Sequence, residues 1–404
     1  MKKLYFLAAG ALLLNIQAIA QGIDVEKSVP LFDVNFVESF GIKDIAPVHP
    51  TLAMCGQSIV VNLGDGSTPV YIDPATGEKK GEIVIGDAVA TGSVASDDMG
   101  NMLICNYCEA KTDFTLYKTS SVASAPEVYL KWNNENSLPI GNRLHVQGDI
   151  NGDAVIVATC DGVGGVTGSK SFIRWDVKNG VPGDAAVCEF TDETMPYWIA
   201  GANDAKVVTK SVDKADGYFV GYYQADKFYH VNGDGTKAEQ FLEGSGGNYD
   251  SNSCDSRPFN GVSYTALMDL SHFPQWGLGG CVYLYNTAVV DAETFSGTIG
   301  ECKALLHTIE MEDYSEGGTK NGAVTGDVLI AKTDAMMGVY YISTTYLGLG
   351  GVMFPAKTSG IDGIGASDNA SVEFFNLQGV RVENPGSGLY IRRQGEKVSK
   401  VIIR

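Results

Sequence analysis

The sequence predicts an all-β protein made of repeated antiparallel sheets, and three observations support this fold class. A turn glycine followed by an alternating apolar strand recurs six times along the chain. Helical periodicity is nearly absent, whereas short runs with period-2 alternation are frequent. Glycine, which supplies tight turns, accounts for 49 of the 404 residues, against 13 prolines. This composition excludes a disordered or collagen-like chain.

Each repeat combines the same parts in the same order. Successive turn glycines lie 44 to 65 residues apart, at Gly56, Gly100, Gly152, Gly217, Gly261 and Gly326. A second strand rich in aromatic residues follows, for example at 114–117, and often a polar turn such as 73–77, which closes a hairpin at little strain. A unit of about 50 residues with three or four strands has the size of one β-propeller blade. We expect about six blades, with seven as the upper count.

A β-helix or a series of β-sandwiches is the alternative architecture. A β-helix needs shorter and more regular coils, and successive sandwiches need linkers, which are missing between residues 50 and 355. The stretch 29–37 alternates like a strand, and we expect it to close the ring by pairing with the last blade. The run 71–78, Tyr-Ile-Asp-Pro-Ala-Thr-Gly-Glu, resembles the strand and turn of secreted YVTN- and PQQ-type propeller repeats.

The N-terminus has the three parts of a secretory signal peptide. Lys2 and Lys3 precede an apolar run at 4–14, and a small-residue site ends at Ala20, so cleavage would leave Gln21 first. A membrane anchor is the competing interpretation, but the apolar run is too short for it. Export of the chain is therefore expected.

The C-terminus, 371–404, alternates in three or four short strands, at 372–376, 380–383, 389–392 and 398–403, which predicts a small β-sandwich-like tail. It resembles a type A C-terminal sorting domain of the type IX secretion system. The residues that carry the resemblance are Asn376, Leu377, Gln378, Gly379, Gly388, Tyr390 and Ile391, before a basic end at 397–404. The resemblance implies the secretion machinery as a partner and an extracellular or outer-membrane surface location; without a working tail the protein would stay in the periplasm.

These features divide the chain into a signal peptide at 1–20, a β-propeller at 21–356, a linker at 357–370 and the sorting-like β domain at 371–404. Removing residues 1–20, which hold two lysines and no acid, takes the formal net charge from −19 to −21. So acidic a chain is a poor partner for nucleic acid, because phosphate binding needs clustered Lys and Arg. No membrane span is expected in the mature chain, since no other apolar run approaches about 20 residues.

Motifs for catalysis are missing from the sequence. It has no Gly-x-Ser-x-Gly elbow, no His-Glu-x-x-His helix and no phosphate-binding loop, and its five histidines are scattered. The run 149–153 departs from a calcium loop at its later positions and is interpreted as a hairpin turn. Eight cysteines leave disulfide pairing open, and 105–108, the sole Cys-x-x-Cys, ends a strand. We predict no catalytic residue, no metal and no cofactor.

The best candidates for ligand contact are aromatic residues in expected loops, namely Tyr197, Trp198 and Trp276. The function expected is that of an exported binding or scaffolding module for a glycan or protein ligand. The alternative is a propeller glycan hydrolase or lyase with a carboxylate, His and Tyr site on one face of the ring. A His/Tyr/Arg cluster or an acid pair in the central pocket would favour the enzyme, and a lining of backbone and aromatics would favour binding.

Overall fold

A computed structural model describes the chain at 22–42, 49–135, 138–162, 168–197, 205–222, 227–244, 249–271, 279–315, 325–333, 335–357, 372–376, 381–386, 388–394 and 397–403. The chain divides into two compact units, one formed by Gln21–Ala356 and the other by Met1–Ala20 with Lys357–Arg404. Each unit is described by itself below.

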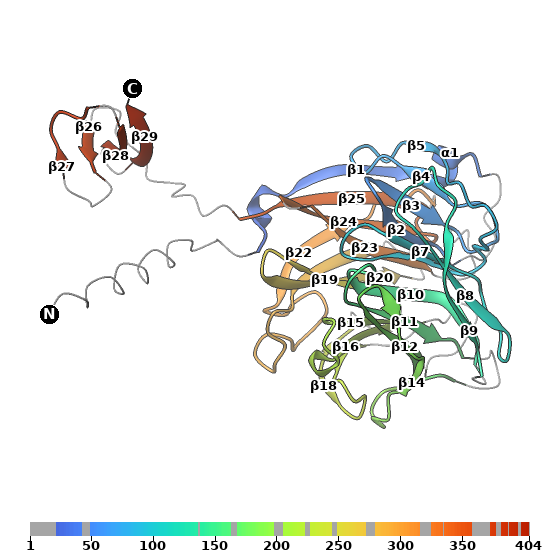
Figure 1. The fold of residues 1–404 in the computed structure, drawn as a ribbon. Coiled ribbons are helices and arrows are strands. Elements are labelled where there is room, and N and C mark those ends of the chain that lie inside the picture. The colour runs from blue at the N-terminus through green and yellow to red at the C-terminus, as the bar shows by residue number, and fades with distance from the viewer. Residues whose placement is uncertain are drawn as a thin grey trace, which may run out of the picture. The chain divides into compact units, whose positions relative to one another are not determined.

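The larger unit consists of consecutive antiparallel sheets (Figure 1). The first holds β2 (Thr51–Cys55), β3 (Ser58–Asn62), β4 (Val70–Ile72) and β5 (Lys79–Glu82). The second holds β6 (Val94–Ser96), β7 (Met102–Cys105), β8 (Asp113–Thr119) and β9 (Glu127–Asn133). The third holds β10 (Ile140–Gly148), β11 (Ala154–Cys160), β12 (Ser171–Lys178), β13 (Val181–Pro182) and β14 (Ala186–Glu189).

Three further sheets complete this unit. The fourth holds β15 (Ala205–Thr209), β16 (Tyr218–Tyr222), β17 (Lys227–Val231) and β18 (Ala238–Glu243). The fifth holds β19 (Tyr249–Phe259), β20 (Val262–Ser271), β21 (Cys281–Asn286) and β22 (Leu305–Glu310). The sixth holds β23 (Gly326–Lys332), β24 (Met336–Ser343), β25 (Gly348–Pro355) and, on its outer edge, β1 (Val29–Asn35).

The first strands of the sheets form a closed ring. β2 contacts β6, β6 contacts β10, and the sequence of contacts continues through β15, β19 and β23 back to β2. Six clusters of buried apolar side chains lie between neighbouring sheets, one at each junction. Sheets packed face to face around a common axis are the defining feature of a β-propeller. The all-β propeller expected from the repeat is confirmed, and the described residues of the larger unit form six sheets.

The N-terminal strand closes this ring, as the sequence predicted. β1 pairs antiparallel with β25, so residues from the two ends of the unit share one sheet. The strand ends earlier than expected because Asn35 caps a short helix, α1 (Phe36–Phe40): its Oδ1 accepts from the backbone N–H of Val37 at 3.1 Å. Gly41, with φ of 71°, ends that helix in the left-handed conformation.

Two glycines of β25 make room for tyrosine rings on the neighbouring strand. Gly350 and Gly351 stand opposite Tyr341 and Tyr340 of β24. A Cβ at Gly350 would overlap the Tyr341 ring, and one at Gly351 would come within 2.7 Å of the Tyr340 ring. The Tyr341 hydroxyl donates to Oδ2 of Asp33 on β1 at 2.7 Å, which ties the closing strand to the sheet. The two glycines therefore leave space for the tyrosine rings beside the strand that closes the ring.

The last repeat copy differs from the first five. In those copies the turn glycine precedes the second strand of a sheet, whereas Gly326 begins β23, the first strand. Gly326 lies against the side chain of Met268 and the carbonyl of Ile342, where a Cβ would collide. Close packing, and not a turn, explains this glycine.

The described helices are short: α1, and the 3-10 turns η1 (Val25–Lys27) and η2 (Lys214–Asp216). Within the described ranges, none has the length and apolar character that a bilayer crossing requires.

The described residues of the C-terminal tail form one four-stranded sheet, whereas a sandwich would need two. Its order is β27-β26-β28-β29. The strands are β26 (Val372–Phe375), β27 (Arg381–Val382), β28 (Gly388–Gln394) and β29 (Lys397–Ile403).

Candidate functional site

A hollow of about 920 Å³ opens at one end of the ring. Its lining comes from the C-terminal ends of four inner strands, β2, β6, β19 and β23, and from the neighbouring parts of β24 and β25. Ligand pockets typically occupy about 300 to 1,000 Å³ and are mostly apolar with a few polar groups. The apolar wall here includes Met54, Met99, Met336, Met353 and Phe259. The hollow is the candidate ligand site in the described residues.

The polar part of the lining is centred on Asp98, which follows β6. Its Oδ1 accepts from Nη1 of Arg257 at 3.1 Å, and its Oδ2 lies 3.2 Å from Nζ of Lys332. The Lys332 ammonium also donates to the Pro258 carbonyl at 2.9 Å. An ammonium group has three N–H donors, so one is left for an acceptor on a ligand. Burial raises the pKa of Tyr340 to about 12, so this lining phenol keeps its proton at neutral pH.

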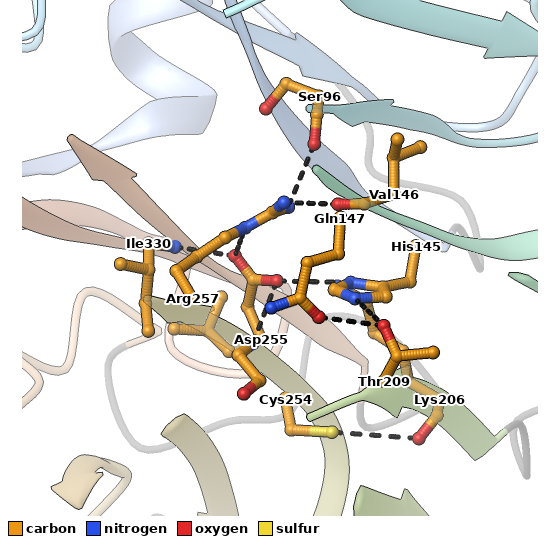
Figure 2. A network of polar contacts seen from close by, with 12 residues as sticks. Ser96, His145, Val146, Gln147, Lys206, Thr209, Cys254, Asp255, Arg257 and Ile330 are labelled. Atoms are coloured by element: carbon orange, nitrogen blue, oxygen red, sulfur yellow. Dashed lines mark hydrogen bonds and ion pairs between the residues drawn. The ribbon is translucent and has the colours of Figure 1, made fainter. Parts of the chain in front are cut away.

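Beneath the hollow, a network of buried polar groups fills the axis of the ring. Asp255 on β19 is its centre (Figure 2). Its Oδ2 accepts from Nε of Arg257 at 3.2 Å and from the backbone N–H of Ile330 at 2.8 Å, and its Oδ1 lies 3.3 Å from Nδ1 of His145. Each of the three side chains, Asp255, Arg257 and His145, is at most 3% exposed.

Arg257 and His145 extend this network to three more inner strands. Arg257 donates from Nη1 to the Val146 carbonyl on β10, and from Nη2 to the Ser96 carbonyl on β6 at 2.9 Å (Figure 2). Nε2 of His145 lies 3.2 Å from Oγ1 of Thr209 on β15. Asp255, Arg257 and His145 together thus join five inner strands, namely β6, β10, β15, β19 and β23.

Asp327 on β23 joins the remaining strand. Its Oδ1 accepts from Nζ of Lys206 at 2.7 Å and from Oγ of Ser253 at 2.5 Å, and its Oδ2 accepts from the Leu52 N–H on β2 at 2.8 Å. Nη1 of Arg143, on β10, lies 3.9 Å from Oδ1. The space left in the middle of the ring is a cavity of about 10 Å³, room for a single water molecule at most.

The charge states follow from burial and from these neighbours. Burial lowers the pKa of His145, and Arg257 adds to that effect, whereas the hydrogen bond to Asp255 opposes it. Burial by itself would raise the pKa of Asp255, but Arg257 and His145 outweigh burial and hold that pKa well below its usual range. His145 is therefore neutral at neutral pH and Asp255 is charged.

A His/Arg/Asp cluster does lie at the axis, but its geometry is that of a structural core. Asp255 is bonded to Arg257, to the Ile330 N–H and to His145, its side chain is only 3% exposed, and the cavity beside it has room for one water molecule at most. The carboxylates that line the hollow are engaged too: Asp73 accepts from the N–H of Ala75 at 2.8 Å, and Asp97 from that of Met99 at 2.9 Å. These hydrogen bonds hold both carboxylates against the backbone of their own turns.

Of the residues predicted for ligand contact, only Tyr197 lies in the described ranges. Its side chain is exposed, and Nζ of Lys170 lies 4.6 Å from the centre of its ring. Tyr197 does not line the hollow. Trp198 and Trp276 fall outside the described residues, as do the cleavage site at Ala20 and Gln21. The aromatic surface therefore stays a prediction.

The tail residues that carry the sorting resemblance are described in part. Asn376 follows β26, and Gly388, Tyr390 and Ile391 lie in β28. The remaining members, Leu377, Gln378 and Gly379, lie outside the described residues.

Within the described residues, cysteines and metal-binding side chains offer no second site. No disulfide joins the eight cysteines, all of which are described, and burial raises the pKa of Cys105 to about 11, which makes it a poor nucleophile. In the described part of the chain, no group of three or more His, Cys, Asp or Glu side chains is placed to hold a metal ion.

The lowered pKa of His145 predicts a pH dependence of stability. An unfolded histidine titrates near pH 6.5, so below about that pH the unfolded chain binds a proton that folded His145 does not, and stability falls. Burial lowers the pKa of His230 and His307 in the same direction. The free energy of unfolding in urea should decrease between about pH 7.5 and about pH 5.5. His145→Gln should flatten that decrease; an unchanged slope would contradict the assignment.

Comparison with known proteins places the fold. Among solved structures, a DUF4623 family protein from Bacteroides eggerthii is similar over 84% of this chain and 77% of its own, with 16% identity and a TM-score of 0.54. Regucalcin from Agrobacterium tumefaciens, described as a calcium-binding protein, aligns over 84% of this chain and 95% of its own (9% identity, TM-score 0.42). A gluconolactonase from Xanthomonas campestris aligns over 78% and 88% (11% identity, TM-score 0.41). The first likeness shows a shared fold.

No curated protein matches this sequence. A family model does: it is described as "Domain of unknown function (DUF8500)" and matches residues 30–355, which span all six sheets of the ring. The chain belongs to the DUF8500 family.

Proposed function

We propose that this chain is an exported propeller that binds a small organic ligand in the hollow at the end of the ring. The ligand has an apolar body and a hydrogen-bond acceptor, and the Lys332 ammonium donates a hydrogen bond to that acceptor. The observation that carries this proposal is the lining itself, which combines four methionines and Phe259 with the linked charges of Asp98, Arg257 and Lys332.

The composition of the wall indicates the shape of the ligand. Methionine is unbranched and polarizable, so it adapts to irregular apolar surfaces, whereas sugar faces are usually met by flat exposed rings. The aromatic residues of the hollow, Phe259 and Tyr340, are only 4% and 3% exposed. An irregular apolar body therefore fits the hollow better than a pyranose ring does.

Lys332→Met tests the binding site, because it removes the ammonium while keeping most of the side chain. We expect the affinity for anilinonaphthalene sulfonate, an apolar fluorophore with an anionic acceptor, to fall at least about tenfold, the size of a lost charged hydrogen bond. The measurement is a fluorescence titration of the mature chain. Lys178→Met, at an exposed lysine paired with Asp153 outside the hollow, is the matched control and should bind like the parent.

Equal affinities of Lys332→Met and the control would refute the role of Lys332. The same protein should be incubated with a panel of polysaccharides, and release of reducing ends would overturn the binding proposal in favour of a glycan hydrolase.

Export is the second part of the proposal, supported by the signal-peptide pattern at 1–20 and by the sorting-like tail. Deleting 371–404 in a host with type IX secretion should leave the protein in the periplasm, whereas the full chain reaches the cell surface or the medium. Cell fractionation and immunoblotting measure the distribution, with Asp153→Asn on the propeller surface as the matched control. Unchanged secretion of the deletion variant would rule out the sorting role.

A further inference from the structure

The accessible methionines of the described residues gather in the hollow. The chain has ten methionines, of which Met1 lies outside the described ranges. Five others are at most 8% exposed: Met102, Met195, Met268, Met311 and Met337. The remaining four are partly or largely exposed, and all four line the hollow. Met99 is 68% exposed and Met336 43% exposed.

Exposure controls how readily a thioether is oxidised, because the oxidant must reach the sulfur. With hydrogen peroxide, a sulfur lone pair attacks one oxygen, the O–O bond breaks and an S=O bond forms. The sulfur loses two electrons, the peroxide is reduced, and a proton transfer releases water. The reaction needs no partner beyond the peroxide.

Oxidation changes the wall of the hollow more than it changes the core. A sulfoxide is polar and chiral, so it disrupts surfaces that methionine makes apolar. The five buried methionines belong to the clusters between sheets and are shielded from the oxidant. Met99 lies in the turn after β6, and Met336 begins β24, both at the rim of the ring.

We propose that the methionines of the hollow, Met99 and Met336 foremost, are a reversible oxidation site for peroxide that shuts the hollow to ligands with an apolar body. This inference rests on the proposed ligand site. Methionine sulfoxide reductases, which act on the two sulfoxide epimers, restore the apolar wall. The hollow thereby binds its ligand under reducing conditions and releases it under oxidative stress.

The test treats the mature chain with graded hydrogen peroxide and follows two readouts. Peptide mass spectrometry should find sulfoxide at Met99 and Met336 before any of the five buried methionines. The affinity for anilinonaphthalene sulfonate should fall at least about tenfold after that first phase, with an unchanged circular dichroism spectrum, and reductase treatment should restore it.

A pair of variants separates the site from general damage. Leucine has nearly the volume of methionine and cannot be oxidised at sulfur, so the double variant Met99→Leu/Met336→Leu should keep its own starting affinity after peroxide. Met311→Leu, at a buried methionine outside the hollow, should lose affinity as the parent does.

The outcomes distinguish the two proposals. If the reduced chain fails to bind the probe, the proposed ligand site is wrong. If peroxide oxidises all methionines at the same rate, the selective oxidation of Met99 and Met336 is refuted. If the reduced and oxidised chains bind the probe equally, the hollow stands as a ligand site but the oxidation switch is wrong.

Discussion

Burial of charge at the ring axis is the constraint on which the rest of the structure depends. Six inner strands meet there, and their side chains include Asp327, Lys206, Asp255 and Arg257, none more than 7% exposed. A buried ion costs several kcal/mol unless it is paired and hydrogen-bonded. Each carboxylate satisfies this requirement by accepting from side chains and backbone N–H groups of different sheets. The ring closes around these carboxylates.

This constraint also decides where a ligand can bind. Paired charges leave a cavity of only about 10 Å³ among themselves at the axis, whereas the hollow of about 920 Å³ lies where the network ends, at Asp98 and Lys332. There the network changes from fully buried to partly exposed, since the Lys332 side chain is 21% exposed. The same lysine thus belongs both to the structural network and to the wall of the hollow.

The sequence predicts much of the fold because its signals are local. Turn glycines such as Gly56 and Gly261 adopt positive φ just before a second strand, and the alternating run at 29–37 predicts the closing strand, which spans Val29–Asn35. The position of the sixth repeat copy within its sheet was predicted wrongly. Gly326 is required by close packing, and the sequence does not distinguish such a glycine from one required by a turn. Local patterns do not tell these two causes apart.

The hollow could not be read from the sequence because its residues converge from distant positions. Met54 and Met99 precede Arg257 by more than 150 residues, and Met353 follows near the end of the unit. One signal for the network is present in the sequence: Lys206 and Asp327 each stand near the start of a strand and are followed by apolar residues, which indicates a buried charge that needs a partner. A lone charge in a strand, however, does not show which residue pairs with it.

Unfolding of Asp327→Asn in urea tests the central role of the buried network most directly. Asparagine keeps the shape of the side chain but removes the charge that Lys206 and Arg143 share. We expect the free energy of unfolding to fall by about 3 to 5 kcal/mol, or the chain not to fold, because a buried cation loses its counter-ion. Asp153→Asn, at the exposed pair with Lys178, should leave stability unchanged within error. Equal stabilities of the two variants would contradict the claim that paired charges at the axis hold the ring together.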